Sequence, residues 1–113
     1  MGCIFCDIVS GKIPAKKVYE DNDILAFDDI VPQAPVHVLV IPKKHVGGVA
    51  EVGDKDSRML TGIFKVINEV ASKKKVAGSG FRVVANHGSN AGQAVPHLHF
   101  HVLGGRAMEW PPG

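Results

Sequence analysis

Three of the six histidines stand in one short segment, HLHFH, each separated from the next by one apolar residue. If the segment is a β-strand, alternate side chains share a face, so His97, His99 and His101 point to one side and the apolar residues between them point to the core. Imidazoles gathered on one face serve metal binding, phosphate chemistry or a pH-sensitive contact. A merely exposed strand is the alternative, but such positions seldom repeat histidine, so we favour a functional face.

Phosphate chemistry suits these residues better than a metal site made from all three. Two histidines two residues apart can share a zinc ion when a third ligand comes from elsewhere, but no carboxylate accompanies them. A phosphoryl-transfer site needs a neutral imidazole to attack phosphorus, a partner that fixes its tautomer, and donors for the oxyanion. Imidazole has a reference pKa of about 6.5 and is largely neutral at pH 7. A second histidine could stay protonated beside the negative phosphate.

The segment NHGSNAGQ, which precedes the histidines, is rich in glycine and amide side chains. Backbone N–H groups of such a loop can approach a phosphate closely, and amide side chains can donate to it. A flexible connection is the alternative, but the adjacent histidines favour a phosphate-binding loop. Its candidate residues are Asn86, Gly88, Asn90, Gly92 and Gln93.

Length and composition limit the remaining possibilities. The 113 residues predict one domain over 1–113, and 45% hydrophobic with 21% charged residues is typical of a folded globular protein. The net charge is +2 and the densest basic run is Lys73 to Lys75, which argues against nucleic-acid or membrane-surface partners. No apolar run approaches the ~18 residues of a membrane span and no secretory leader is seen, so we expect a cytoplasmic protein.

The elements that must position the histidines can be predicted from periodicity. Apolar residues at helical spacing predict a short helix near the N-terminus and one long helix, whereas runs of β-branched and aromatic residues predict five strands. Most connections are too short for a parallel crossover, so we expect an antiparallel sheet in an α+β domain, with residues 36–42 as a central strand. The predicted helices are 4–10 and one that starts at 54–57 and stops by Gly78; the strands are 16–20, 24–28, 36–42, 81–86 and 97–103.

With these residues in view, the chain resembles a known family. HLHFH followed by VL matches the His-φ-His-φ-His-φ-φ signature of the histidine triad superfamily of nucleotidyl hydrolases and transferases. IFCDIVSGKIPAKKVYED, LAFDDIVPQAPVHVLVIPKKH, NHGSNAGQ and GGRAMEWPPG extend the resemblance to the Hint branch, the purine nucleoside phosphoramidate hydrolases. The resemblance implies a homodimer with the sheet extended across it and a tail, residues 104–113, that reaches the partner's nucleotide site.

The same resemblance assigns roles to the histidines. His99 would be the nucleophile that becomes nucleotidylated, and His101 and His37 would flank the phosphate. The backbone carbonyl of His97 would orient the nucleophile. These four residues form the predicted catalytic set.

The resemblance also implies a nucleotide site, in which Asp29 would bind the ribose hydroxyls. For the apolar members of the purine pocket, packing in the core is the alternative. Ala94 stands where relatives often carry a hydroxyl residue that contacts the leaving group, so one donor is absent. The predicted pocket is Ile4, Phe5, Ile8, Phe27, Ile30 and Leu39; the phosphate and leaving-group residues are Asn86, Gly92, Gln93, Ala94 and Val95; Trp110 would shape leaving-group selectivity from the tail.

The two cysteines, spaced C-x-x-C, suit metal chelation or dithiol chemistry better than a stabilising disulfide. Cys3 and Cys6 could join His45 and His97 to give two thiolates and two imidazoles, a set suited to structural zinc. Redox chemistry and simple burial are the alternatives. Zinc would hold the N-terminal helix to the sheet, and the chemistry itself would need no cofactor.

The resulting hypothesis is a hydrolase that cleaves the P–N bond of purine nucleoside 5′-phosphoramidates, of the AMP-amine or AMP-lysine type, through a nucleotidyl-histidine. Two alternatives stay open. One is a dinucleoside polyphosphate hydrolase of a sister branch, which uses the same triad. The other is a non-catalytic scaffold protein that binds a nucleotide or zinc.

Overall fold

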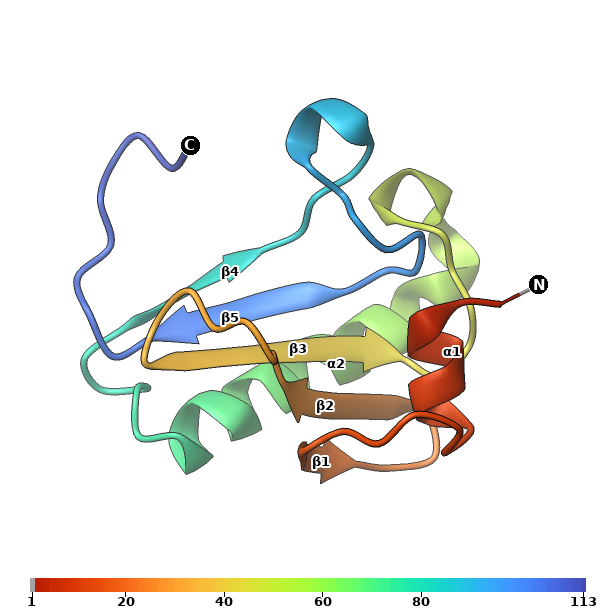
Figure 1. Ribbon diagram of the computed structural model, residues 1–113, viewed down its shortest axis with the longest axis horizontal. Helices are drawn as coiled ribbons and strands as arrows, with labels where there is room; N and C mark the ends of the chain where they lie inside the picture. The colour runs from red at the N-terminus through yellow and green to blue at the C-terminus, as the bar shows by residue number, and fades with distance from the viewer. Residues whose placement is uncertain (1) are drawn as a thin grey trace.

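A computed structural model describes residues 2–113 and contains the elements that periodicity predicts (Figure 1). The long helix and the five strands are present, with small differences at their ends, and three short 3-10 turns join them. The elements are α1 (Ile4–Val9), β1 (Lys17–Glu20), β2 (Ile24–Asp28), β3 (Val36–Pro42), α2 (Ser57–Lys73), β4 (Phe81–Val84) and β5 (Phe100–Gly104); the 3-10 turns are η1 (Val49–Glu51), η2 (Asp54–Asp56) and η3 (Ser89–Ala91).

The five strands form one antiparallel sheet in the order β1-β2-β3-β5-β4, which confirms the predicted α+β class and the central place of β3. Strand alternation gives each face its own apolar cluster. One cluster packs under α2, and the other joins α1 to β2 and β3. Figure 1 shows α2 behind the sheet and α1 in front of it. The sheet therefore separates a structural face under α2 from a second face that holds the histidines.

Helix α2 ends before the expected stop at Gly78. Lys75 takes a left-handed conformation with φ 63°, and its N–H donates to the carbonyl of Ser72 at 3.0 Å. The N–H of Val76 donates to the carbonyl of Ala71 at 2.9 Å. This pair of bonds is a Schellman closure, and the buried Val76 side chain that follows anchors it. Packing of Val76 therefore sets the end of the helix.

Strand β5 begins at Phe100, three residues later than predicted. Before it, the N–H of Leu98 donates to the carbonyl of Val46, beyond the end of β3, at 2.6 Å. His97 donates its N–H to the carbonyl of Val95 at 2.9 Å. His97 and Leu98 thus donate outside the β3 ladder, whose last pair on this side is Val40 with Phe100.

The register of β3 and β5 still brings histidines together. Leu39 stands opposite His101 and His37 stands opposite Leu103, so His37 and His101 are diagonal neighbours on one face. The predicted strand 81–86 is shorter than expected, since β4 ends at Val84.

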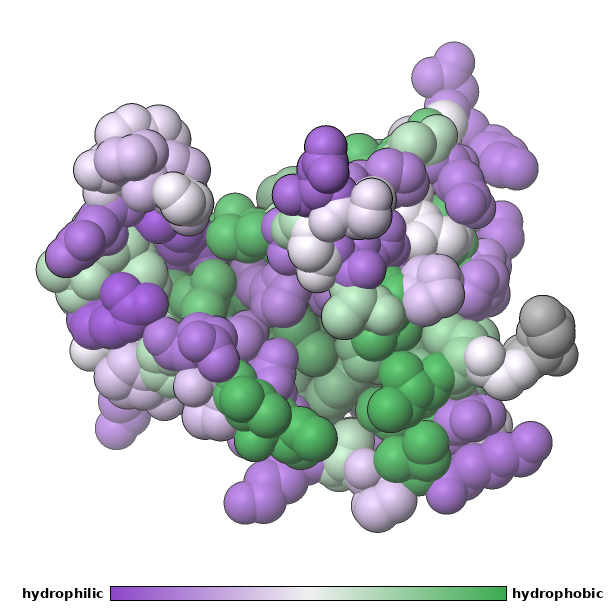
Figure 2. Space-filling model, turned by 45° about the horizontal axis from the view of Figure 1, so that its top comes forward, coloured by the Kyte–Doolittle hydropathy of each residue, from purple (hydrophilic) through white to green (hydrophobic). Residues whose placement is uncertain are grey.

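The exterior carries several large apolar side chains, seen as green patches among polar ones in Figure 2. Ile30, Val31 and Trp110 are the most exposed of them. Within residues 2–113, no helix combines the length and apolar character that crossing a membrane requires.

Candidate active site and metal centre

His99 is held in one tautomer by the backbone. Its Nδ1 lies 2.7 Å from the carbonyl oxygen of His97. A carbonyl only accepts hydrogen bonds, so Nδ1 carries the proton and, in the neutral ring, Nε2 keeps its lone pair. The ring is buried, and the edge-on ring of Phe5 lies 5.1 Å away between centroids. A fixed neutral imidazole with a free Nε2 has the form that a nucleophile requires.

His101 lies next to His99, with 5.1 Å between the ring centroids, and forms a pair with His37. His37 Nε2 is 2.9 Å from His101 Nδ1, and the backbone N–H of Gln33 donates to His37 Nδ1 at 3.0 Å. A carboxylate oxygen of Asp29 lies 3.4 Å from His37 Nε2. Asp29, His37 and His101 have the composition of a metal site. In this arrangement, however, the two ring nitrogens that face each other are bonded together.

The pKa values of both imidazoles of this pair are lowered, which favours their neutral forms. Burial, together with His99 and His37, lowers the pKa of His101 to about 4. Burial also lowers the pKa of His37, although the charge of Asp29 opposes the shift. The expected protonated histidine beside a bound phosphate stays a prediction. The pair can donate hydrogen bonds without carrying charge.

Acidification should destabilise the fold between about pH 6.5 and pH 4. An unfolded histidine has a pKa of about 6.5, whereas that of folded His101 is about 4. In this window the unfolded chain binds more protons, so the free energy of unfolding falls as the pH falls. At ~1.4 kcal/mol per pKa unit, the loss is about 3 kcal/mol by pH 4.

Urea unfolding at pH 7, 5.5 and 4 measures this loss, and His101→Asn should reduce the pH dependence. An equally steep dependence in His101→Asn would show that other groups cause it.

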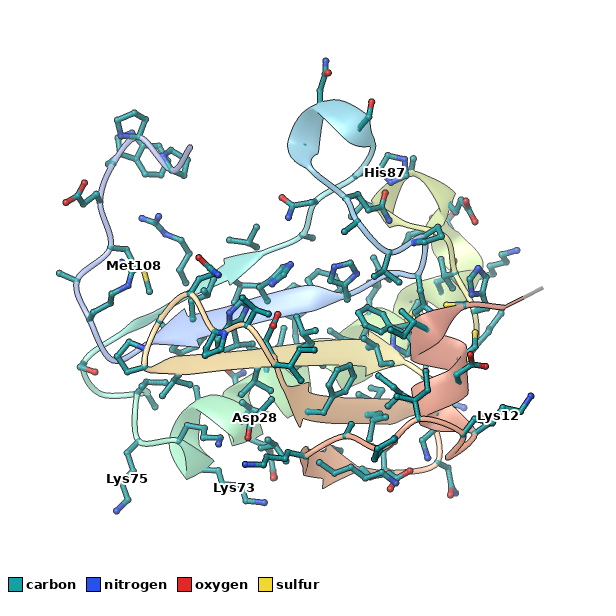
Figure 3. The ribbon with its side chains drawn as sticks, viewed as in Figure 1. Lys12, Asp28, Lys73, Lys75, His87 and Met108 are labelled. Atoms are coloured by element: carbon teal, nitrogen blue, oxygen red, sulfur yellow. The ribbon has the colours of Figure 1, made fainter. Side chains whose placement is uncertain are left out.

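The loop before the histidines is fixed to the segment that follows β3. The side chain of Gln93 accepts from the N–H of Gly88 at 2.9 Å and donates to the carbonyls of Gly47 at 2.9 Å and Val95 at 3.1 Å. His87, labelled in Figure 3, accepts from the N–H of Ala50 at 3.4 Å. Both amide hydrogens of Gln93 are thus in use. Gln93 holds the loop, and donors for a phosphate must come from its other members.

The remaining loop residues are more accessible. Gly92 takes a left-handed φ of 81°, a conformation that a side chain would strain. Gly92 and Ala94 are exposed, whereas Asn86 and Val95 are half-buried.

The six predicted residues of the purine pocket fall into two groups. Four are buried in the cluster between α1 and the sheet: Phe5, Ile8, Phe27 and Leu39. Ile4 and Ile30 instead lie at the surface, 49% and 94% exposed. Ile30 lines an open hollow of about 660 Å³ together with Asp29 and His37. This hollow brings the predicted ribose residue beside the histidine pair.

Two further predicted residues are placed by backbone contacts and by the tail. One oxygen of Asp29 accepts from the N–H of Val31 at 2.8 Å, which leaves the other facing His37. Trp110 lies on the tail, 81% exposed, with the guanidinium carbon of Arg82 6.0 Å from its ring centroid.

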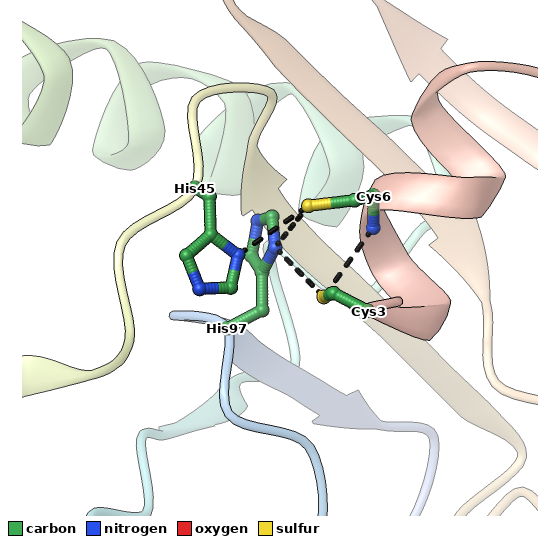
Figure 4. A group of neighbouring side chains, drawn as sticks. All are labelled: Cys3, Cys6, His45 and His97. Carbon is green, nitrogen blue, oxygen red and sulfur yellow. Dashed lines mark hydrogen bonds between the residues drawn. The ribbon is translucent and has the colours of Figure 1, made fainter. Parts of the chain in front are cut away.

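The four predicted metal ligands converge at the start of α1 (Figure 4). The ligand atoms of Cys3, Cys6, His45 and His97 all lie within 4.8 Å of one another. The α1 helix brings its thiols together because Cys3 caps it, accepting from the N–H of Cys6 at 3.5 Å. Two sulfurs and two imidazole nitrogens are the donor set of structural zinc, so the residues fit this metal.

The ring of His97 is oriented to act as a metal ligand. Its Nε2 lies 2.8 Å from the carbonyl oxygen of Pro42, so Nε2 carries the proton and Nδ1 keeps its lone pair. Nδ1 faces the sulfurs of Cys3 at 3.4 Å and Cys6 at 3.6 Å. Burial lowers the pKa of His97, which favours the neutral ring that ligates metals. Burial and the neighbouring Cys3 raise the pKa of Cys6, so a metal would have to displace its proton.

The backbone groups in these contacts could not be identified from residue types. The N–H of Gln33 bonds to His37, and no sequence motif marks it. Phe5 is predicted as a pocket residue, and its ring also lies against those of His97 and His99, 5.8 Å and 5.1 Å away between centroids. The contacts of His37 and Phe5 depend on how the fold places β3 and α1, which residue types do not indicate.

Comparison with known proteins supports a single family. The model of the HIT domain family matches residues 10–108. An uncharacterized HIT-like protein of Synechocystis is 47% identical over 110 residues, which cover 97% of this chain and 96% of that protein. A solved HIT family hydrolase of Legionella pneumophila has a TM-score of 0.97 and 49% identity, over 99% of this chain and 100% of its own. A histidine triad nucleotide-binding protein of Candida albicans has a TM-score of 0.83 and 34% identity, over 97% and 83%.

The matched segment contains all five strands, α2 and the HLHFH histidines. It begins after α1, so Cys3 and Cys6 of the metal-ligand group lie outside it. The histidine pattern, the sheet topology and these matches agree, and the chain belongs to the HIT domain family.

Proposed function

We propose that this protein is a hydrolase of purine nucleoside 5′-phosphoramidates that acts through a nucleotidyl-His99 intermediate. The contact between His99 Nδ1 and the carbonyl of His97 carries this proposal, because it leaves Nε2 free to attack. The HIT family hydrolase among the similar structures supports a hydrolytic reaction, and the nucleotide-binding relative supports a nucleotide substrate. Neutral His101 supplies a hydrogen-bond donor beside the nucleophile.

The chemistry balances in two displacements. In the first, the lone pair of His99 Nε2 forms a bond to the α-phosphorus while the P–N bond breaks, and the nitrogen takes a proton from solvent and leaves as an amine. The imidazole becomes cationic, and the carbonyl of His97 stabilises it through Nδ1–H. In the second, water attacks phosphorus, the N–P bond to His99 breaks, and the nucleoside monophosphate leaves. The water that attacks in this second step returns a proton to solvent. No cofactor takes part in either step.

The group of Cys3, Cys6, His45 and His97 would hold structural zinc. When bound, zinc would supply a cross-link between α1, the segment after β3 and the residue that starts the histidine segment. The residues themselves position Phe5 of α1 against the ring of His99. This cross-link would keep Phe5 in place beside the ring of His99.

We also infer a homodimer in which the tail of one protomer reaches the other's nucleotide site. The tail offers Trp110 to solvent within its own chain, and an exposed tryptophan is a favourable contact residue at interfaces. Ile30 and Val31, near the hollow, are exposed as well. These side chains give a partner's tail apolar groups to contact.

A direct comparison of substrates tests the proposed function. Purified protein and His99→Ala are assayed with adenosine 5′-phosphoramidate and with diadenosine polyphosphates. Turnover of the phosphoramidate that the substitution abolishes is the expected result. Preferential cleavage of the polyphosphate would move the protein to the sister branch, and turnover of neither substrate would favour a binding scaffold.

Deleting residues 107–113 should change substrate selectivity more than folding. The tail follows the last strand and contributes no residue to either apolar cluster, so the midpoint of thermal unfolding should stay within a few degrees of the full chain's. We expect the ratio of kcat/KM between phosphoramidates with bulky and small amines to change about tenfold. Trp110→Ala is the matched point variant, and an unaltered ratio in both proteins would contradict a role for the tail.

A further inference from the structure

Arg106 holds a peptide group of the loop between β2 and β3. Its Nε and Nη2 atoms lie 3.3 Å and 3.0 Å from the carbonyl oxygen of Gln33, so two donors of one guanidinium converge on one acceptor. Its Nη1 donates to the carbonyl of Ala107 at 3.1 Å. Met108, labelled in Figure 3, follows on the tail. Arg106 thus ties the end of β5 to the loop opposite.

The N–H of the same residue, Gln33, which belongs to the preceding peptide group, reaches the histidine pair. It donates to His37 Nδ1 at 3.0 Å. A backbone N–H only donates, so His37 Nδ1 must be unprotonated and the proton of the neutral ring sits on Nε2. That proton points to His101 Nδ1, 2.9 Å away, which must therefore accept. The proton of neutral His101 is left on Nε2.

Few other contacts restrain this loop. Ile30, Val31 and Gln33 are exposed, so little burial opposes local opening. Within the loop, the side chain of Gln33 donates only to the carbonyl of Val31, at 3.1 Å. The fork of Arg106 holds the carbonyl of Gln33 from the tail. An arginine can fix one carbonyl with two bonds, where a lysine offers a point charge.

The fold brings Arg106 to this position through Gly105. That residue has φ 88°, and a Cβ atom added to it would lie 2.9 Å from Cβ of Pro35. The chain therefore passes directly against the loop just before Arg106. The close approach places the guanidinium over the Gln33 peptide.

We propose that Arg106 is a positioning residue that fixes the tautomers of His37 and His101 by holding the backbone of Gln33 at its carbonyl, so that His101 presents an Nε2–H donor toward the substrate phosphate. The tautomer control is a property of the free protein; its use on a phosphate rests on the proposed function. Loss of Arg106 frees the backbone of Gln33, its N–H included, and the pair then exchanges between two tautomeric arrangements. His101 spends part of its time with an unprotonated Nε2, which cannot donate to a phosphate oxygen.

Imidazole ¹⁵N chemical shifts of the free protein at pH 7 test this directly, because they distinguish a protonated from an unprotonated ring nitrogen. In the unmodified protein, Nε2 of His37 and His101 should show the protonated shift and Nδ1 the unprotonated one. Arg106→Gln should move these shifts toward averaged values, and Arg106→Lys should fall between. Arg82→Ala is the matched control: Arg82 also donates to a tail carbonyl, that of Glu109 at 2.9 Å, but does not touch the loop.

In turnover, Arg106→Gln should lower kcat about fivefold to tenfold with a smaller change in KM, since the loss is in donor alignment. Unchanged ¹⁵N shifts in Arg106→Gln, or an equal change in Arg82→Ala, would overturn the proposal. The shifts need no substrate, so this result is obtained even if phosphoramidates are not turned over. Failure of the proposed function is thereby told apart from failure of this inference.

Discussion

His99→Ala should lower kcat for phosphoramidate hydrolysis by at least about 10³-fold, because it removes the atom that forms the covalent bond to phosphorus. In the intact protein, Nδ1 is fixed 2.7 Å from the His97 carbonyl and Nε2 is free. Neither His37 nor His101 can replace it. His37 is bonded through both nitrogens, and the bond that its Nε2 makes to His101 Nδ1 leaves the proton of neutral His101 on Nε2. Rapid quenching followed by mass spectrometry should detect a nucleotidyl adduct on the intact protein and none on the variant.

Two measurements test whether a loss of activity in His99→Ala comes from a loss of structure. Thermal unfolding of His99→Ala should remain cooperative, because the substitution removes one ring beside Phe5 and leaves the core under α2 untouched. In His99→Gly, added imidazole should restore part of the activity by occupying the vacated space. An adduct that persists without His99 would show that another residue is the nucleophile.

Removing a thiol from the metal-ligand group should cause the largest loss of stability. With Cys3→Ser or Cys6→Ser, one of four ligand atoms that lie within 4.8 Å of one another is replaced by a poor zinc ligand. At a free zinc concentration 1,000 times the dissociation constant, bound metal stabilises a fold by about 4 kcal/mol. Chelator treatment of the unmodified protein should reproduce this loss, as the midpoint of thermal unfolding reports.

Ser10→Ala is the matched control for the cysteine variants. Ser10 lies at the end of the same helix and its hydroxyl bonds only to the exposed carbonyl of Asp7, at 3.2 Å. This variant should retain stoichiometric zinc by elemental analysis. Unmodified protein that carries no zinc, together with an unchanged unfolding midpoint in Cys3→Ser, would refute the metal site.

The fold could be predicted largely because its apolar periods are long and regular. The 17-residue helix α2 and the apolar β3 carry their patterns over their whole lengths. The ends of elements were predicted less well, since they depend on tertiary contacts. Val76 closes α2 by packing against the sheet, and the N–H of Leu98 donates to the carbonyl of Val46, which no local pattern indicates.

The same distinction holds for the candidate site, where residue types could be predicted from the sequence but their contacts could not. Histidines and cysteines are recognised by type, and the structure brings the predicted metal ligands together. Hydrophobic type alone does not separate a pocket wall from the core: Phe27 is buried, whereas Ile30 is almost fully exposed. Gln93 has the type of a phosphate donor, but its amide is committed to Gly47 and Val95. Only the folded chain determines which hydrogen-bond donors remain available to a ligand.

His97 contributes its ring and its backbone carbonyl to different parts of the site, and this affects how mutants at position 97 should be interpreted. Its ring faces the thiols, but the group that orients His99 is a peptide oxygen, which every amino acid possesses. A change of side chain at position 97 therefore alters the metal-ligand group and leaves the acceptor of His99 in the chain. Impaired catalysis in such a mutant would result from looser packing around His99 and not from the loss of a proton-transfer group.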